Sequence, residues 1–237
     1  MLGLGNSITS GYIPFTLTSV SSLALWLQNG VGVSASQWND SSGNNNHAIQ
    51  GTGGNQATVS DGGLDFEETE TDHYDFTNIA IADEGGFCIA WVQQSESASI
   101  NTLLSDTNNE MIQIQNSSKL RLVTNDPSVI TTQIHVNGTP FGNAKAVFLL
   151  NRTAGSSGAF SVFKNGIELT IQPDSGDSTN ADAGANTHGF SVDTLGARNG
   201  SDHIFDGKIF ELAFWNRSLT SGEIADVNGY LKNFHGL

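Results

Sequence analysis

The chain has 237 residues, enough for a sizeable core, and all-β sandwiches of this length often form a single domain. Its 24 acidic and 9 basic side chains give a formal net charge of −15, and residues 1–118 carry 13 of the acidic side chains and no basic one. Long-range repulsion and the lack of a basic stripe therefore exclude the binding of nucleic acid through its phosphates.

Residues 1–17 are predicted to form an N-terminal arm, because they are rich in Gly, Ser and Thr and their apolar residues follow no period. The apolar residues of this arm are Leu2, Leu4, Ile8, Tyr12, Ile13 and Phe15. Such residues are poorly suited to free solvation, so we expect them to pack on a surface, either of this domain or of a neighbour. The segment lacks the positive start of a signal peptide, and no apolar run reaches bilayer length, so we expect no membrane contact.

Residues 18–237 are predicted to form one all-β domain. Closely spaced apolar runs without a long helical pattern between them favour a sandwich of two antiparallel sheets. The runs lie at residues 23–27, 63–66, 73–81, 86–93, 100–104, 111–115, 119–124, 129–136, 145–150, 159–171, 189–196 and 203–215. Cys88 stands alone in one of these runs, and we expect a small buried hydrophobe there and not a reactive thiol.

The polar segment 37–48 is predicted to form a turn. Asp40 can accept bonds from backbone amides two or three residues further on, and Gly43 can adopt a left-handed conformation. A structural turn is the favoured interpretation. The alternative is a sugar or ion site that uses the run of Asn residues and His47.

Glu68, Glu70 and Asp72 would place three carboxylates on one face if their segment were a strand. Paired carboxylates serve as acid and nucleophile in glycoside hydrolysis. Thr69 and Thr71, however, stand between them where a buried catalytic strand would need core residues. We therefore predict an exposed connection, no catalytic residues and no enzyme activity.

No cofactor or metal site can be assigned from the sequence. Calcium remains an alternative because Asp and Asn are abundant, but no dense Asp-x-Asp-x-Asp-Gly loop ending in Glu is present. The histidines are His47, His73, His135, His188, His203 and His235. No two of them share a predicted element at metal-ligand spacing, so most are expected at surface or turn positions.

One hairpin is predicted where Asn165 and Gly166 separate the apolar segments 160–164 and 167–171, because this pair suits a two-residue type I′ turn. Asn199 and Gly200 are a weaker form of the same signal. Residues 173–188 form a long polar stretch with few apolar residues, which is predicted to be a loop available for contact with a partner.

The C-terminal segment is predicted to be a buried strand that leads into a helix at about residues 221–232. Alternation places Ile209, Glu211, Ala213 and Trp215 on one face of the strand and Phe210, Leu212 and Phe214 on the other. Thr220 and Glu223 have the spacing of a capping box. Ile224, Val227, Tyr230 and Leu231 then recur on one helical face.

This C-terminal pattern resembles the ending of laminin G-like, or concanavalin A-like lectin and glucanase, domains. The opening also resembles them, in Leu25-Trp-Leu27, in the turn that begins Asp40-Ser-Ser-Gly-Asn, and in Gly63-Leu-Asp-Phe66. The resemblance covers about residues 20–237 and implies a jelly-roll sandwich with a short C-terminal helix.

The arm followed by a single sandwich is most similar to structural proteins of tailed bacteriophages, particularly marine ones. The resemblance implies a non-catalytic virion protein, assembled in the host cytoplasm, that serves as a capsid decoration, head fibre or tail appendage. It would bind other virion proteins through the arm, form a homo-oligomer or symmetric assembly, and display loops to host glycans. The alternatives are a soluble carbohydrate-binding lectin and a diverged glycoside hydrolase.

Overall fold

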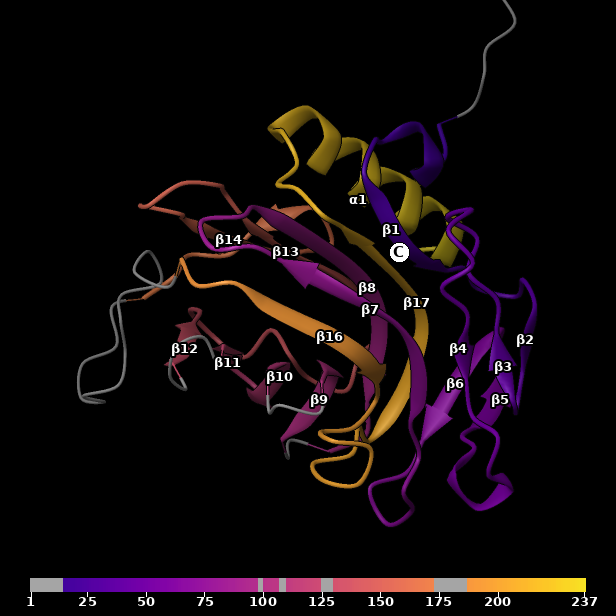
Figure 1. Ribbon diagram of the computed structural model, residues 1–237. Coiled ribbons are helices and arrows are strands. Elements are labelled where there is room, and N and C mark those ends of the chain that lie inside the picture. Colours follow the sequence, from indigo (N-terminus) through magenta and orange to yellow (C-terminus); the bar gives the residue numbers. More distant parts are fainter. Residues whose placement is uncertain (1–14, 98–99, 107–109, 125–129, 173–186) are drawn as a thin grey trace, which may run out of the picture.

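The computed structural model describes residues 15–97, 100–106, 110–124, 130–172 and 187–237 (Figure 1). The predicted all-β sandwich is confirmed, with an eight-stranded and a nine-stranded sheet whose strand pairs are all antiparallel within the described part. The arm residues 1–14 and most of the predicted loop, 173–186, lie outside the described residues. No helix in the described ranges is long and apolar enough to span a bilayer.

The eight-stranded sheet has the order β15-β14-β13-β8-β17-β6-β5, and β1 pairs with β17 beside this path. Its strands are β1 (Leu23–Leu27), β5 (Thr58–Ser60), β6 (Gly63–Phe66), β8 (Phe87–Ser95), β13 (Ala146–Arg152), β14 (Phe160–Lys164), β15 (Ile167–Glu168) and β17 (Gly207–Trp215). The predicted hairpin joins β14 and β15, with φ of 49° at Asn165 and 80° at Gly166. Its second strand ends at Glu168, before the end of the apolar run.

The nine-stranded sheet has the order β12-β11-β10-β9-β16-β7-β4-β3-β2. Its strands are β2 (Val33–Ser34), β3 (Gln37–Trp38), β4 (Ala48–Ile49), β7 (Tyr74–Ile81), β9 (Asn101–Ser105), β10 (Met111–Asn116), β11 (Lys119–Thr124), β12 (Ile130–His135) and β16 (Phe190–Leu195). Two 3₁₀ turns, η1 (Leu17–Ser19) and η2 (Gly53–Asn55), precede β1 and β5.

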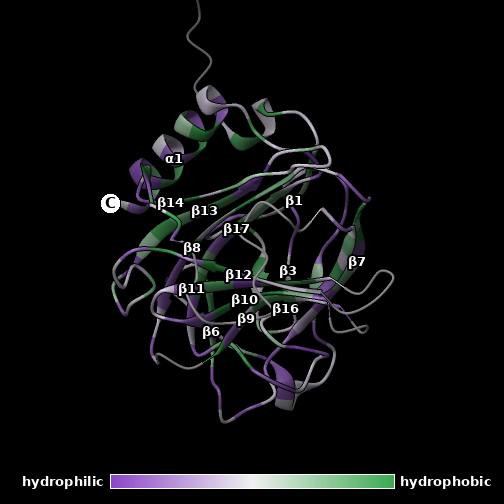
Figure 2. Ribbon diagram, turned by 90° about the vertical axis from the view of Figure 1, so that its left-hand side faces the viewer, coloured by the Kyte–Doolittle hydropathy of each residue, from purple (hydrophilic) through white to green (hydrophobic). Residues whose placement is uncertain are grey.

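Two apolar clusters hold the layers together. The larger one fills the space between the sheets and includes Trp38, Trp91 and Phe148. The second lies between the eight-stranded sheet and helix α1 (Ser221–His235), which covers the outer face of that sheet (Figures 1 and 2). Cys88 belongs to this second cluster and is fully buried, which raises the pKa of its thiol and confirms the structural interpretation. The layer order is therefore helix, eight-stranded sheet, nine-stranded sheet.

Strand β17 corrects one sequence prediction. Ile209 lies in the cluster between the sheets with Leu212 and Phe214, whereas Phe210 lies in the cluster under α1 with Ala213. The pairing with β8 shifts between Ile209 and Glu211. Such a bulge adds a residue to one strand and reverses the side to which the preceding side chains point. Simple alternation was therefore wrong for Ile209 and Phe210.

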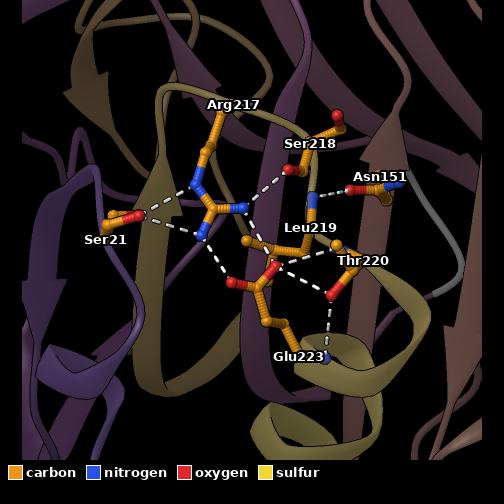
Figure 3. Close-up of polar contacts among 7 residues, drawn as sticks. All are labelled: Ser21, Asn151, Arg217, Ser218, Leu219, Thr220 and Glu223. Atoms are coloured by element: carbon orange, nitrogen blue, oxygen red, sulfur yellow. Dashed lines mark hydrogen bonds and ion pairs between the residues drawn. The ribbon is translucent and has the colours of Figure 1, made fainter.

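The turn between β17 and α1 is held by Arg217 (Figure 3). Its guanidinium group donates to both carboxylate oxygens of Glu223, at 2.9 and 2.6 Å, and to the carbonyl and hydroxyl oxygens of Ser21. The hydroxyl of Thr220 accepts the Glu223 N–H at 3.3 Å, and the Glu223 carboxylate accepts the Thr220 N–H at 2.9 Å, so the capping box is confirmed. These bonds tie the first turn of α1 to the segment before β1.

The described chain enters the domain along α1. Leu17 is fully buried in the cluster under the helix, and the ring of Phe15 meets that of Tyr230 edge to face, with centroids 6.1 Å apart. The arm therefore joins the domain on the helix side, which lies across the sandwich from the outer face of the nine-stranded sheet (Figure 1).

Candidate functional site

A row of polar side chains crosses the outer face of the nine-stranded sheet. Thr102 of β9 pairs with Gln113 of β10, and Gln113 pairs on its other side with Arg121 of β11. Arg121 in turn pairs with Gln133 of β12. We call these four residues the polar row. The apolar neighbours of Gln113 and Arg121 on the same strands belong to the core between the sheets, so the polar row points away from the core.

The polar row contains hydrogen-bonding atoms without partners. Gln113 is fully buried and its Nε2 donates to Thr102 Oγ1 at 2.8 Å, but its Oε1 accepts no bond from the described residues. The Oε1 of Gln115, on the same strand, and the Nε of Arg121 are likewise buried and unpartnered in this part of the chain. A buried polar atom without a partner costs about 1–3 kcal/mol, so bonding to a water molecule, an ion or a ligand would be favourable there.

The hairpin from Arg198 to Asp202, which follows β16, adds a second arginine. Main-chain bonds between these two residues close the hairpin, and Asn199 and Gly200 at its tip have φ of 50° and 67°, as the predicted Asn-Gly turn requires. The Arg198 guanidinium group pairs with the Asp202 carboxylate, while its Nε is buried and unpartnered among the described residues.

Anchoring bonds place this hairpin beside the polar row. The hydroxyl of Ser105 at the end of β9 donates to the Ala197 carbonyl at 2.6 Å, and the Thr102 N–H donates to the His203 carbonyl at 3.2 Å. Burial lowers the pKa of the Arg121 guanidinium, and the nearby positive charge of Arg198 lowers it further. The site therefore combines amide groups with two neighbouring arginines.

The segment around Asp40 is a structural turn, as predicted. The Asp40 carboxylate accepts the N–H groups of Trp26 at 2.9 Å, Ser42 at 2.8 Å and Asn46 at 3.0 Å, which joins the turn to β1. His47 Nδ1 accepts the Asp40 N–H at 3.0 Å. Because these groups already bond to one another, the turn is explained without a sugar or an ion.

The three carboxylates considered for catalysis do not share a strand face. Glu68 and Glu70 are exposed on a turn between β6 and β7 and line an open hollow with Asp202 and His203. Asp72 is buried, accepts the Glu67 N–H at 3.1 Å, and has a pKa that burial raises above its ordinary value. The turn therefore separates the buried carboxyl from the two exposed ones.

The described residues contain no group of three or more His, Cys, Asp or Glu side chains placed to hold a metal ion. Individual histidines bond to other groups. His235, for example, lies 2.7 Å from the buried Glu211 carboxylate under α1.

Sequence reasoning missed the polar row and Arg198. The alternation of Gln113 and Gln115 with isoleucines, and of Lys119 and Arg121 with leucines, does predict strands with one polar face. Alternation does not predict the register between strands. The register decides which polar side chains of the four strands lie side by side.

A profile of the concanavalin A-like lectin/glucanases superfamily, of the laminin G type, matches residues 68–225. No curated protein sequence matches this chain. Among solved structures, Trypanosoma rangeli sialidase aligns with a TM-score of 0.56 at 16% identity over 91% of this chain and 33% of its own. The chain thus spans about a third of the length of that sialidase.

Two further structures align less closely. The Ruminococcus gnavus IT-sialidase CBM40 bound to alpha2,3 sialyllactose gives a TM-score of 0.41 at 18% identity over 62% of this chain and 83% of its own. The botulinum neurotoxin type G receptor binding domain gives 0.47 at 14% identity, over 89% and 52%. At such identities structural likeness establishes the fold alone. Since the family profile covers most of the chain and the two-sheet architecture agrees with it, this protein belongs to the concanavalin A-like lectin/glucanases superfamily.

Proposed function

We propose that this protein is a non-catalytic glycan-binding module that uses the outer face of the nine-stranded sheet. The observation that carries the proposal is the polar row, in which a fully buried Gln113 leaves its amide oxygen without a partner among the described residues. Sugar hydroxyls both donate and accept hydrogen bonds, so a glycan suits a surface with unpartnered amide oxygens and guanidinium N–H groups.

We further propose that the module belongs to a virion of a tailed bacteriophage, as a capsid decoration, head fibre or tail appendage. The resemblance stated for the arm and sandwich supports this assignment. The position of Phe15 on α1 is compatible with it, because an arm that binds other virion proteins on the helix side leaves the polar row facing outward. Mass spectrometry of particles purified from the source culture tests it, since absence of the chain from every virion fraction contradicts it.

The glycan-binding proposal is tested on a glycan array with the full chain. We expect binding that weakens at least ~10-fold in Gln115→Ala and Gln133→Ala, since a lost bond to a buried ligand group costs about 1–3 kcal/mol. Asn233→Ala, an amide removed from the exposed face of α1, is the matched control and should bind as the wild type does. Equal weakening by all three variants, or no binding to any glycan, rejects the proposal.

A separate assay with polysaccharides tests catalysis. We expect no release of reducing sugar from laminarin, agar or carrageenan, because Glu68 and Glu70 lie on an exposed turn without the support of a strand, and Asp72 is buried apart from them. Hydrolysis that disappears in Glu68→Gln or Glu70→Gln would instead establish an enzyme whose site is the hollow beside Asp202.

A further inference from the structure

Arg121 has unusual surroundings for a basic side chain in a protein with 24 acidic and 9 basic side chains. Among the described residues, no carboxylate or other acceptor bonds its guanidinium group, and the charge that perturbs its pKa is that of another arginine, Arg198. By contrast, Arg217 is paired with Glu223, and Lys208 lies 3.5 and 3.6 Å from Asp61 and Asp65. Arg198 is paired with Asp202, whereas no described carboxylate pairs with Arg121, although the positive charge of Arg198 lies near it.

The fold holds this pair of charges in place. Arg121 lies in the interior of the sheet, with β10 on one side and β12 on the other. Arg198 starts a hairpin closed by its own main chain and joined to β9 through Ser105. Two like charges held together in partly buried positions repel each other, and an anion between them relieves that repulsion.

We infer that the polar row, together with Gln115 and Arg198 beside it, binds an anionic glycan. Arg121 and Arg198 would recognise a carboxylate or sulfate group of the sugar, and the amides of Gln113 and Gln115 would recognise its hydroxyls. This inference rests on the proposed glycan-binding function and names its ligand class. The planar fork of an arginine matches the two oxygens of either anion, and such charge-assisted bonds are stronger than bonds between neutral groups.

The strands that form the row support the same ligand class. The sequences of β9, β10, β11 and β12 contain no Phe, Tyr or Trp, so none of these strands offers an aromatic ring on which a sugar could stack. Affinity must then come from hydrogen bonds and charge. Two arginines at the site supply the charge despite a net charge of −15 for the whole chain.

The test uses pairs of soluble oligosaccharides that share a backbone and differ in the anionic group. One pair is oligogalacturonate and its methyl ester, which isolates the carboxylate. The other is carrageenan oligosaccharides and their chemically desulfated forms, which tests the sulfate. Binding is measured by calorimetry at low and high salt, because an ion-paired complex weakens as salt screens the charges.

We expect the full chain to prefer the anionic member of at least one pair, and we expect Arg121→Gln and Arg198→Gln to weaken that binding at least ~10-fold. Arg121→Lys keeps the charge but loses the fork and should bind with intermediate affinity. Lys232→Gln removes the same charge from α1, across the sandwich, and is the matched control that should leave affinity unchanged.

The outcomes separate this inference from the proposed function. Binding to neutral glycans that is equal in wild type and Arg121→Gln overturns the anionic ligand but keeps the glycan-binding module. Binding to no oligosaccharide overturns both. Weakening by Lys232→Gln as large as by Arg121→Gln would show a general charge effect and also overturn the inference. Unchanged thermal unfolding of Arg121→Gln establishes that any loss of binding is not a loss of fold.

Discussion

The junction between β17 and α1 and the polar row each contain an arginine, but the two guanidinium groups have opposite surroundings. Arg217 donates to Glu223, to Ser21 and to the Ser218 carbonyl, so its bonding capacity is used within the fold (Figure 3). Arg121 makes no such bond among the described residues. Hydrogen bonds completed inside the chain stabilise a fold, whereas polar groups left without a partner can still gain stability by bonding to a ligand.

The two outer faces of the sandwich differ in the kind of side chains that they carry and in what covers them. On the helix side, α1 and the segment around Leu17 cover an apolar cluster. On the other side, half-buried polar residues such as Gln115, Lys119 and His135 surround the polar row. We therefore expect changes on the helix side to alter stability and changes at the polar row to alter binding.

The largest effect is expected at Leu231. This residue is fully buried between α1 and the eight-stranded sheet, so Leu231→Ala should lower the free energy of unfolding by about 2–5 kcal/mol through the cavity that it leaves. Asn233→Ala, on the exposed part of the same helix, should change it by less than about 0.5 kcal/mol. Urea unfolding measures both. A small effect of Leu231→Ala would mean that α1 is not an integral layer of the fold.

A smaller effect should distinguish the two arginines directly. Arg217→Gln removes charge-assisted bonds to Glu223 and should lower the free energy of unfolding by about 1–3 kcal/mol. Arg121→Gln removes no bond to the described residues and relieves repulsion from Arg198, so it should change stability by less than about 0.5 kcal/mol or increase it. If Arg121→Gln destabilises as much as Arg217→Gln, Arg121 is a structural residue and the comparison fails.

Local sequence signals predicted most of the fold. Alternation located the long strands, and the spacing of Thr220 and Glu223 located the start of α1, because each depends on neighbours in the chain. The orientation of Ile209 and Phe210 was not predictable, since a bulge that depends on the pairing with β8 reverses it. For the same reason the meeting of Arg121 and Arg198 was not predictable, because it requires the register of several strands and the position of a hairpin far away in the sequence.

The smallest expected effect is a pH dependence at the junction. The hydrogen bonds from Arg217 lower the pKa of Glu223 from its ordinary value of 4.5 to about 2, with a further contribution from the Thr220 N–H. A carboxyl whose pKa is lowered by folding stabilises the protein above its unfolded pKa, and the contribution is lost as pH falls through the folded value. The gain is therefore complete above about 4.5 and should disappear between about 4.5 and 2.

Glu223→Gln isolates this effect, because its side chain does not titrate. The difference in free energy of unfolding between wild type and this variant should shrink as pH falls through the same window. Asp72 acts in the opposite direction, since burial raises its pKa and its protonation stabilises the fold at low pH. That contribution is common to both proteins and cancels in the difference. A difference that stays constant from about pH 7 to 2 would show that the Arg217 pair contributes no charge-dependent stability, and the distinction between the two arginines would then rest on hydrogen bonding alone.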